Sequence, residues 1–303
     1  MIDVIFMGTP DYADAILKKL IEDADINVKA VYTQPDKPVG RKKVLTAPIV
    51  KTTAQENNIP VYQPQSLRDE SVVSELLQIE CDYIVVAAYG QILPRAILDH
   101  APCINLHASI LPQYRGASPI QQTLLHGDKE TGVTAMLMEE GLDTGDILKI
   151  EKIEVGDDEM VESLFESLTQ VAAALTLDVL KNFTAYTPVP QDDAAATHCK
   201  KITKADGLVH FDDAQTLFNK YRAFTPWPGI YLASKLKLKK IALEDTESKN
   251  RAGEILSIDK ESIVVGCEKG SLRIFRVQPE SKKEMDVLAY INGKRLSLAD
   301  TLS

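Results

Sequence analysis

The chain has 303 residues, of which 45% are hydrophobic and 26% charged, and its formal net charge at pH 7 is −10. This length predicts two domains, and this composition is ordinary for a globular protein with a sizeable core. The chain has no run of eighteen apolar residues and no basic-then-apolar leader, so we expect no membrane span, no signal peptide and a cytoplasmic protein.

Apolar runs alternate with amphipathic segments through the first half of the chain. The apolar runs cover residues 4–7, 28–32, 59–62, 83–88, 102–106, 133–138 and 148–155. Helical patterns cover 12–21 and 72–77, and a long apolar stripe marks 161–180 as a helix that packs on the sheet. This alternation predicts an α/β domain with a Rossmann-like, mostly parallel sheet and crossover helices.

The pattern changes after Lys181. Residues 186–203 are rich in proline, alanine and aspartate with little periodicity, which favours a linker. A helix is expected at 214–222. Short strand-like runs follow at 229–232, 236–243, 253–259, 262–265 and 272–277, which predicts a small OB-like β-barrel. The predicted organisation is therefore a catalytic domain at 1–185, a linker at 186–203 and a second domain at 204–303.

The first strand ends in Gly8-Thr9-Pro10-Asp11, which opens a helix. This turn superficially resembles a dinucleotide-binding loop, but the second glycine that lets the backbone approach a pyrophosphate is missing. We therefore expect a capped turn, with proline near the helix start, rather than a nicotinamide site.

Asn105 and His107 stand two residues apart at the end of a predicted buried strand, so their side chains share one face of the sheet. Ligands bind at the carboxyl ends of strands in open α/β sheets. A second loop, flanked by Gly141 and Gly145, brings in Asp143. An amide, an imidazole and a carboxylate that orients it suffice to move an acyl group onto an amine. Each residue alone is more ordinarily a satisfied hydrogen-bonding group or a turn residue.

Residues 33–49 form a long connection after the second predicted strand. Pro35, Pro38, Gly40 and Pro48 argue against regular structure there. Its basic residues are Lys37, Arg41, Lys42 and Lys43. A solvated loop is the ordinary interpretation. Because the loop follows a strand that ends at the same sheet edge as Asn105 and His107, it also predicts a clamp on a phosphate backbone.

The four cysteines, Cys81, Cys103, Cys199 and Cys267, lie far apart and match no metal-ligand spacing. We expect reduced thiols and no metal site. No basic residue flanks Cys103, so a nucleophilic role is disfavoured.

The strand end and the glycine-flanked loop form a longer signature. Its residues are Asn105, His107, Ser109-Ile110-Leu111-Pro112, Tyr114-Arg115-Gly116 and Asp143-Thr144-Gly145. With this signature the chain resembles the formyltransferases that use 10-formyltetrahydrofolate. Further stretches resemble the branch that formylates methionine on initiator tRNA, and they run nearly end to end. They are Phe6-Met7-Gly8-Thr9-Pro10, Thr33-Gln34-Pro35-Asp36, Ala88-Tyr89-Gly90-Gln91-Ile92-Leu93-Pro94 and Arg222-Ala223-Phe224-Thr225-Pro226-Trp227-Pro228-Gly229.

The resemblance implies a Rossmann-like domain followed by an OB-like barrel. It places the catalytic residues on Asn105, His107 and Asp143, and the folate-contacting segment on Ser109, Ile110, Leu111 and Pro112. The formyl donor would be 10-formyltetrahydrofolate and the acceptor the α-amine of initiator methionyl-tRNA, with no metal. The loop that enters the tRNA acceptor region would fall on 34–48, with Arg41 as its key arginine beside Lys37, Lys42 and Lys43. We expect a cytoplasmic monomer whose partners are tRNA and folate.

Other functions remain open at this point. A formyltransferase for a nucleotide-linked amino sugar shares the same three residues, but a small substrate does not need a long basic loop. A glycinamide ribonucleotide formyltransferase would lack the second domain. An RNA-binding module with a degenerate enzyme domain is disfavoured by the intact set of three residues.

Overall fold

A computed structural model describes residues 1–40 and 42–302. It divides into two compact units, each formed by separate segments of the chain. Unit 1 contains Met1–Pro119, Glu130–Glu154 and Phe165–Cys199. Unit 2 contains Ile120–Lys129, Val155–Leu164 and the chain from Lys200 onward. The predicted boundaries at 185 and 203 stay a prediction. The structure adds that the segment expected to be a linker belongs to unit 1 as far as Cys199.

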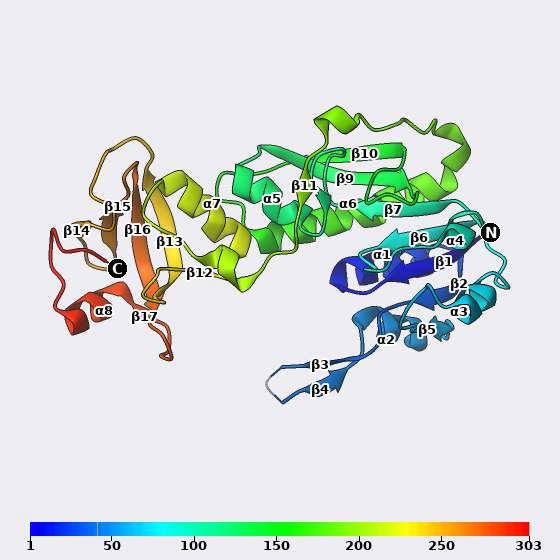
Figure 1. The fold of residues 1–303 in the computed structure, drawn as a ribbon, viewed down its shortest axis with the longest axis horizontal. Helices are drawn as coiled ribbons and strands as arrows, with labels where there is room; N and C mark the ends of the chain where they lie inside the picture. The colour runs from blue at the N-terminus through cyan, green and yellow to red at the C-terminus, as the bar shows by residue number, and fades with distance from the viewer. Residues whose placement is uncertain (41, 303) are drawn as a thin grey trace. The chain divides into compact units, whose positions relative to one another are not determined.

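A seven-stranded sheet forms the centre of unit 1. Its strands are β1 (Ile2–Gly8), β2 (Ile26–Tyr32), β5 (Val61–Tyr62), β6 (Tyr83–Ala87), β7 (Cys103–His107), β9 (Glu130–Leu137) and β10 (Ile147–Glu154). Their order is β10-β9-β7-β6-β1-β2-β5, which can be followed from top to bottom in Figure 1. The five strands from β7 to β5 are parallel, whereas β9 and β10 pair antiparallel at one end. The predicted Rossmann-like, mostly parallel sheet is confirmed.

Helices alternate with these strands, as the periodicity predicts. They are α1 (Asp11–Glu22), α2 (Ile49–Glu56), α3 (Glu70–Leu76), α4 (Arg95–Leu98), α5 (Pro119–His126) and α6 (Val161–Lys181). In α1, Asp11 and Asp14 lie in the first turn and Lys19 in the last, which complements the helix dipole. Its buried face includes Ile16 and Leu20, four residues apart, so the helix packs through one stripe.

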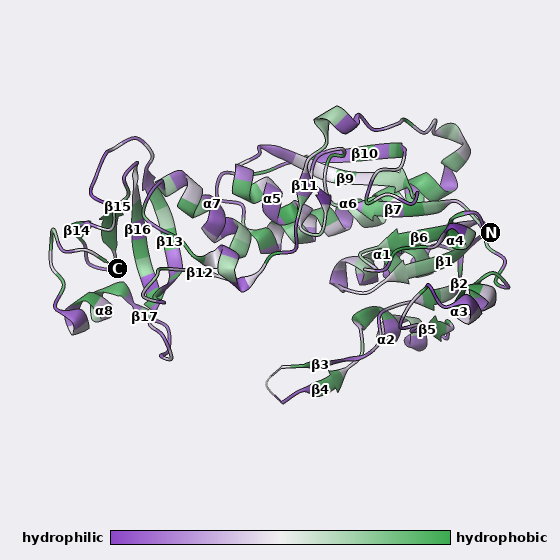
Figure 2. Cartoon of the chain, viewed as in Figure 1, coloured by the Kyte–Doolittle hydropathy of each residue, from purple (hydrophilic) through white to green (hydrophobic). Residues whose placement is uncertain are grey.

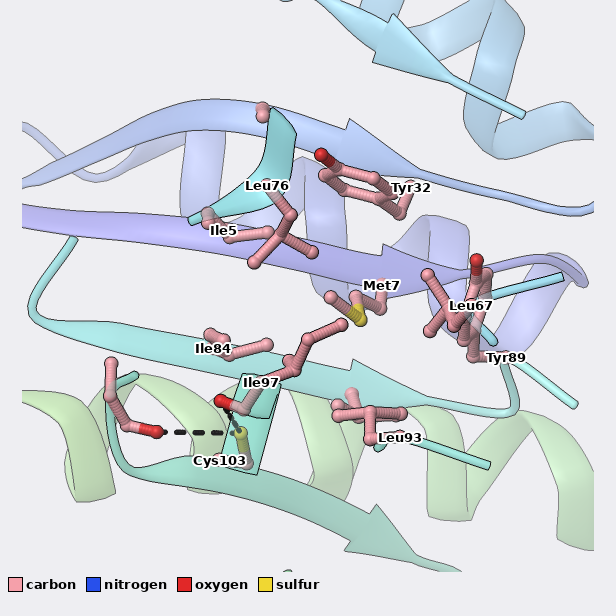
Figure 3. Packing of buried hydrophobic residues seen from close by; sticks show 13 residues of the cluster. Ile5, Met7, Tyr32, Leu67, Leu76, Ile84, Tyr89, Leu93, Ile97 and Cys103 are labelled. Carbon is pink, nitrogen blue, oxygen red and sulfur yellow. Dashed lines mark hydrogen bonds between the residues drawn. The ribbon is translucent and has the colours of Figure 1, made fainter. Parts of the chain in front are cut away.

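One face of the sheet carries the hydrophobic cluster shown in Figure 3. Ile5 of β1 faces Ile84 of β6, which faces Cys103 of β7, and all three side chains are buried. Leu76 from α3 and Ile97 from α4 cover them. Figure 2 shows that the central strands β1 and β6 are largely hydrophobic, whereas β10 at the end of the sheet is largely hydrophilic. The apolar runs therefore predict the central strands correctly.

The α6 helix is long and apolar enough to span a membrane by length and composition alone, and it is the one such helix among the described residues. Half of its most apolar window is buried inside the protein. Buried residues such as Leu164, Leu168 and Val179 recur at helical spacing, which is also typical of a core helix.

The prolines and the glycine of the long basic connection predict an irregular structure, and this prediction is wrong for part of it. It contains a hairpin of β3 (Lys37–Val39) and β4 (Val44–Thr46), which projects from unit 1 in Figure 1. Pro38 is tolerated because an isolated two-stranded ribbon leaves backbone donors unpaired toward solvent. Gly40 adopts a φ of 71° and so supplies the left-handed residue that the turn needs.

Unit 2 is built on an antiparallel sheet. Its strands are β12 (Ile230–Tyr231), β13 (Lys237–Asp245), β14 (Ile255–Ile258), β15 (Ile263–Gly266), β16 (Ser271–Gln278) and β17 (Met285–Asp286). The order is β12-β13-β16-β15-β14, and β17 also pairs with β16. Two helices accompany it, α7 (Ala214–Phe224) and α8 (Val287–Lys294). The predicted strand-rich second domain is confirmed.

Helix α7 holds the earlier chain segments within unit 2. Asn219 donates from Nδ2 to the carbonyl oxygen of Leu125 at 3.4 Å. The Arg222 guanidinium, which is 3% exposed, donates to the carbonyl oxygens of Gly156 at 3.3 Å and Glu159 at 3.4 Å. Unit 2 is therefore completed by segments that precede its main part by many residues.

Candidate active site

Strand β7 presents Asn105 and His107 on one face of the sheet. Cys103 precedes them on the same face and is buried in the hydrophobic cluster. Asn105 lies between Val86 of β6 and Met136 of β9, so paired strands hold it on both sides. The face of β7 therefore changes from apolar to polar as the strand approaches its carboxyl end.

The imidazole of His107 is buried and held by a carbonyl group. Its Nε2 lies 2.9 Å from the carbonyl oxygen of Tyr114. A carbonyl only accepts hydrogen bonds, so Nε2 carries a hydrogen and donates it. The other ring nitrogen, Nδ1, faces Asp143 at 3.7 Å from Oδ2. Nδ1 is thus the ring nitrogen that faces the carboxylate.

Asp143 lies in the loop between β9 and β10 and meets both β7 side chains. Its Oδ2 accepts a 2.8 Å hydrogen bond from the backbone N–H of Gly116, and its Oδ1 accepts from Asn105 Nδ2 at 3.4 Å. The φ of Asp143 is 54°, a left-handed conformation that few residues other than glycine, asparagine and aspartate adopt readily. The structure therefore brings the three predicted residues together.

The segment predicted to contact folate turns two side chains into the protein. Ser109 donates from Oγ to the carbonyl oxygen of Gln113 at 2.6 Å, and Leu111 is 3% exposed. Thr134 of β9 accepts from the Leu111 N–H at 3.1 Å and donates to the Ser109 carbonyl at 2.7 Å. Ile110 and Pro112 are partly exposed. The hydrogen bonds fix this segment, and Ile110 and Pro112 are its two side chains that remain partly accessible to solvent.

The segment expected to be a linker supplies residues that the sequence analysis missed. Gln191 donates from Nε2 to the carbonyl oxygens of Asp143 at 2.9 Å and Gly145 at 2.8 Å. Its Oε1 accepts from Arg115, whose side chain is 3% exposed. No local periodicity marks Gln191. Its neighbours in the sequence are rich in alanine and aspartate, and this composition predicts a linker rather than part of an active site.

A short parallel pairing joins the same segment to the site. Strand β11 (His198–Cys199) pairs with β8 (Arg115–Gly116). Cys199 donates from Sγ to the Tyr114 carbonyl at 3.3 Å, the oxygen that also accepts from His107. Burial raises the pKa of the Cys199 thiol, so the neutral thiol is the form that makes this contact.

Burial also raises the pKa of Cys103 to about 12, so this thiol is protonated at neutral pH. It donates to the carbonyl oxygen of Ala101 at 3.4 Å. Among the described residues, no group of three or more His, Cys, Asp or Glu side chains is placed to hold a metal ion.

Three of the four basic residues predicted in the connection lie on or beside the exposed β3–β4 hairpin. Lys37, Lys42 and Lys43 are exposed, whereas Arg41 lies outside the described residues. The hairpin follows β2, which is parallel to β7 within the sheet, so both strands end at the same edge. The connection that carries the hairpin therefore leaves the sheet at the edge where β7 also ends.

Family models match both halves of the chain. The model described as formyl transferase matches residues 2–180, and the formyl transferase C-terminal domain matches 201–295. The chain is 68% identical over 300 residues to the methionyl-tRNA formyltransferase of Sulfurimonas denitrificans, covering 99% of both chains. It is 54% identical over 300 residues to that of a Nitratiruptor species, covering 98% of this chain and 99% of the relative.

Solved structures share the fold at low identity. An N-formyltransferase from Helicobacter canadensis, in complex with folinic acid and dTDP-3-aminofucose, superposes with a TM-score of 0.69 at 16% identity, covering 91% of this chain and 99% of that one. HypX from Aquifex aeolicus in complex with tetrahydrofolic acid gives a TM-score of 0.61 at 16% identity over 98% of this chain. The chain spans about half of HypX, 48% of its length.

Proposed function

The chain belongs to the formyl transferase family and, within it, has the function of a methionyl-tRNA formyltransferase, and from this premise we propose that Asn105, His107 and Asp143 catalyse the transfer. The donor we propose is 10-formyltetrahydrofolate and the acceptor is the α-amine of methionine on initiator tRNA. The observation that carries the proposal is the convergence of the three side chains. Asp143 accepts a hydrogen bond from Asn105, and its Oδ2 lies 3.7 Å from His107 Nδ1.

The proposed step begins when the neutral amine attacks the formyl carbon, forming a C–N bond and placing negative charge on the formyl oxygen. Asn105 stabilises this oxygen, because an amide has two N–H donors and Asp143 takes only one. Protonated His107 stabilises the same oxygen through its positive charge, because its two N–H groups face the Tyr114 carbonyl and the Asp143 carboxylate. Asn105 and His107 thus supply the oxyanion site.

The intermediate then breaks the bond between the formyl carbon and the leaving folate nitrogen. The proton released by the attacking amine must reach that nitrogen, either through His107 Nδ1 or through a water held by Asp143. Asp143 keeps Nδ1 oriented throughout, while the Tyr114 carbonyl fixes Nε2 at 2.9 Å. We propose that the folate rests on the segment Ser109–Pro112.

The acceptor distinguishes this function from formylation of a nucleotide-linked amino sugar. We expect the purified protein, given 10-formyltetrahydrofolate, to formylate charged initiator methionyl-tRNA and to leave uncharged tRNA unmodified. The product is measured as formylmethionine after hydrolysis of the ester. A dTDP-linked amino sugar serves as the alternative acceptor, and preferential formylation of that sugar would contradict the tRNA assignment.

The exposed hairpin is the proposed tRNA clamp. Replacing Lys37, Arg41, Lys42 and Lys43 by alanine is expected to raise the KM for tRNA by about tenfold or more and to leave kcat near its original value, because phosphate contacts contribute binding that does not depend on the reaction step. The slope of log affinity against log salt should also become shallower.

The control replaces Lys18 and Lys19 of α1 by alanine, which removes two positive charges from the same unit outside the hairpin. It should leave the KM for tRNA unchanged. An unchanged KM in the hairpin variant as well would mean that tRNA is held elsewhere. We also propose that the enzyme is cytoplasmic and acts as a monomer. Sedimentation of the purified protein with and without tRNA would test the oligomeric state.

A further inference from the structure

The side-chain amide of Gln191 forms hydrogen bonds with two different parts of unit 1, the Asp143 loop and Arg115. Its Nε2 donates to the carbonyl oxygens of Asp143 at 2.9 Å and Gly145 at 2.8 Å, on either side of Thr144. Its Oε1 accepts from Arg115 Nε at 3.0 Å and Arg115 Nη2 at 2.8 Å. Two donors and two acceptor sites are all that an amide offers, so every hydrogen-bonding position is occupied.

Arg115 fixes which way this amide points. A guanidinium has only donors, so it selects the oxygen of Gln191 and directs the NH₂ group toward the two carbonyls. The reverse orientation would place oxygen against oxygen and NH₂ against a cation. Arg115 Nη2 also pairs with Asp193 at 2.8 Å, and the arginine side chain is 3% exposed. Gln191 is therefore held in a single orientation.

The same arrangement holds Asp143 at both its backbone and its side chain. Gln191 binds the Asp143 carbonyl, while Gly116, the residue after Arg115, donates to the Asp143 carboxylate at 2.8 Å. Asp143 has a left-handed φ of 54°, which aspartate tolerates better than most residues but which is still less favourable than a negative φ in a free loop. Contacts from outside the loop are thus needed to keep the carboxylate beside His107.

We propose that Gln191 is a positioning residue for formyl transfer, which acts by fixing the Asp143 loop and does not touch the substrate. The inference rests on the proposed catalytic role of Asp143. It assigns a part in the reaction to the segment that the sequence predicts to be a linker. Lys200 and Lys201 follow this segment directly, so the residues that position the carboxylate and the start of the second domain are close in sequence.

The sharpest variant is Gln191→Glu. It has the same size and keeps the oxygen that Arg115 binds, but it replaces the donor to Asp143 and Gly145 by a carboxylate oxygen. We expect kcat to fall by about 10- to 100-fold with KM values for tRNA and folate within about twofold, because a displaced catalytic group costs turnover rather than binding. The Tm should stay close to that of the original protein, since the contact with Arg115 is retained.

The charge-matched control is Gln170→Glu, on an exposed position of α6 in unit 1, which should have the original kcat. A pH series adds a readout that a structural role would not move. Lowering the pH protonates the introduced carboxyl and restores one donor, so the kcat ratio of Gln191→Glu to the original protein should rise as the pH falls.

Gln191→Ala tests the same inference without added charge and should also lower kcat selectively. A kcat within twofold of the original for both variants would overturn the inference. So would a loss that is confined to KM, or one fully accounted for by an unfolded fraction. An original protein that formylates none of the acceptors would overturn the proposed function instead, and the inference with it, so the two failures are distinguishable.

Discussion

Replacing Asp143 by asparagine is expected to lower kcat by about a thousandfold while the protein stays folded. The carboxylate faces three donors, from Gly116, Asn105 and the protonated form of His107 Nδ1. An asparagine offers one oxygen, so its NH₂ group must face at least one of these donors. The negative charge that orients the imidazole is also lost. Asparagine accepts the left-handed φ of 54°, so the loop itself is not strained by the change.

The measurement is single-turnover formylation together with urea unfolding of the same preparation. The free energy of unfolding should change by no more than about 1 kcal/mol, as is usual for a near-isosteric change outside the core. Asp99→Asn is the control, because this exposed carboxylate pairs with Arg95 on α4 and lies outside the site. Full turnover in Asp143→Asn would rule out an essential carboxylate at this position.

Replacing Gly116 by alanine is expected to destabilise unit 1 by about 2–4 kcal/mol and to abolish most of the activity. Gly116 has a φ of 121°, and a Cβ atom there would lie 2.2 Å from the carbonyl oxygen of Cys199. That oxygen belongs to backbone paired with β8, so it cannot rotate away as a side chain would. Separating β8 from β11 would also move the N–H that binds the Asp143 carboxylate.

Gly90→Ala separates the two causes of this loss. Gly90 also has a left-handed φ, 78°, but the nearest atom to an added Cβ is Gln34 Nε2 at 4.0 Å. We expect it to cost about 1 kcal/mol through the backbone conformation alone. Urea unfolding monitored by circular dichroism measures both variants. Equal costs at the two positions would show that the close approach to Cys199 does not determine the effect.

The sheet and the three converging residues could be predicted because local patterns encode them. Short apolar runs between helical segments indicate parallel strands, and the spacing of Asn105 and His107 places both on one face of β7 whatever surrounds it. Asp143 was found through its flanking glycines. Each of these signals lies within a few residues of the feature that it predicts.

The features that sequence reasoning missed depend on contacts between distant segments. Gln191 reaches Asp143 across 48 positions, and a single side-chain amide leaves no periodic trace in the sequence. The proline- and alanine-rich composition around it predicted a linker, but a segment of this composition can still be fixed by hydrogen bonds to its neighbours. The β3–β4 hairpin was missed because Pro38, the proline within it, is tolerated in an exposed ribbon.

The discontinuous composition of unit 2 limits how this protein can be divided or recombined. Ile120–Lys129 and Val155–Leu164 belong to unit 2, although they lie within the stretch that the N-terminal family model covers. A cut after Cys199 would separate Leu125 and Gly156 from their donors on α7. The C-terminal part is therefore not a detachable module. A chimera that exchanged it between relatives would have to exchange these two inserted segments as well.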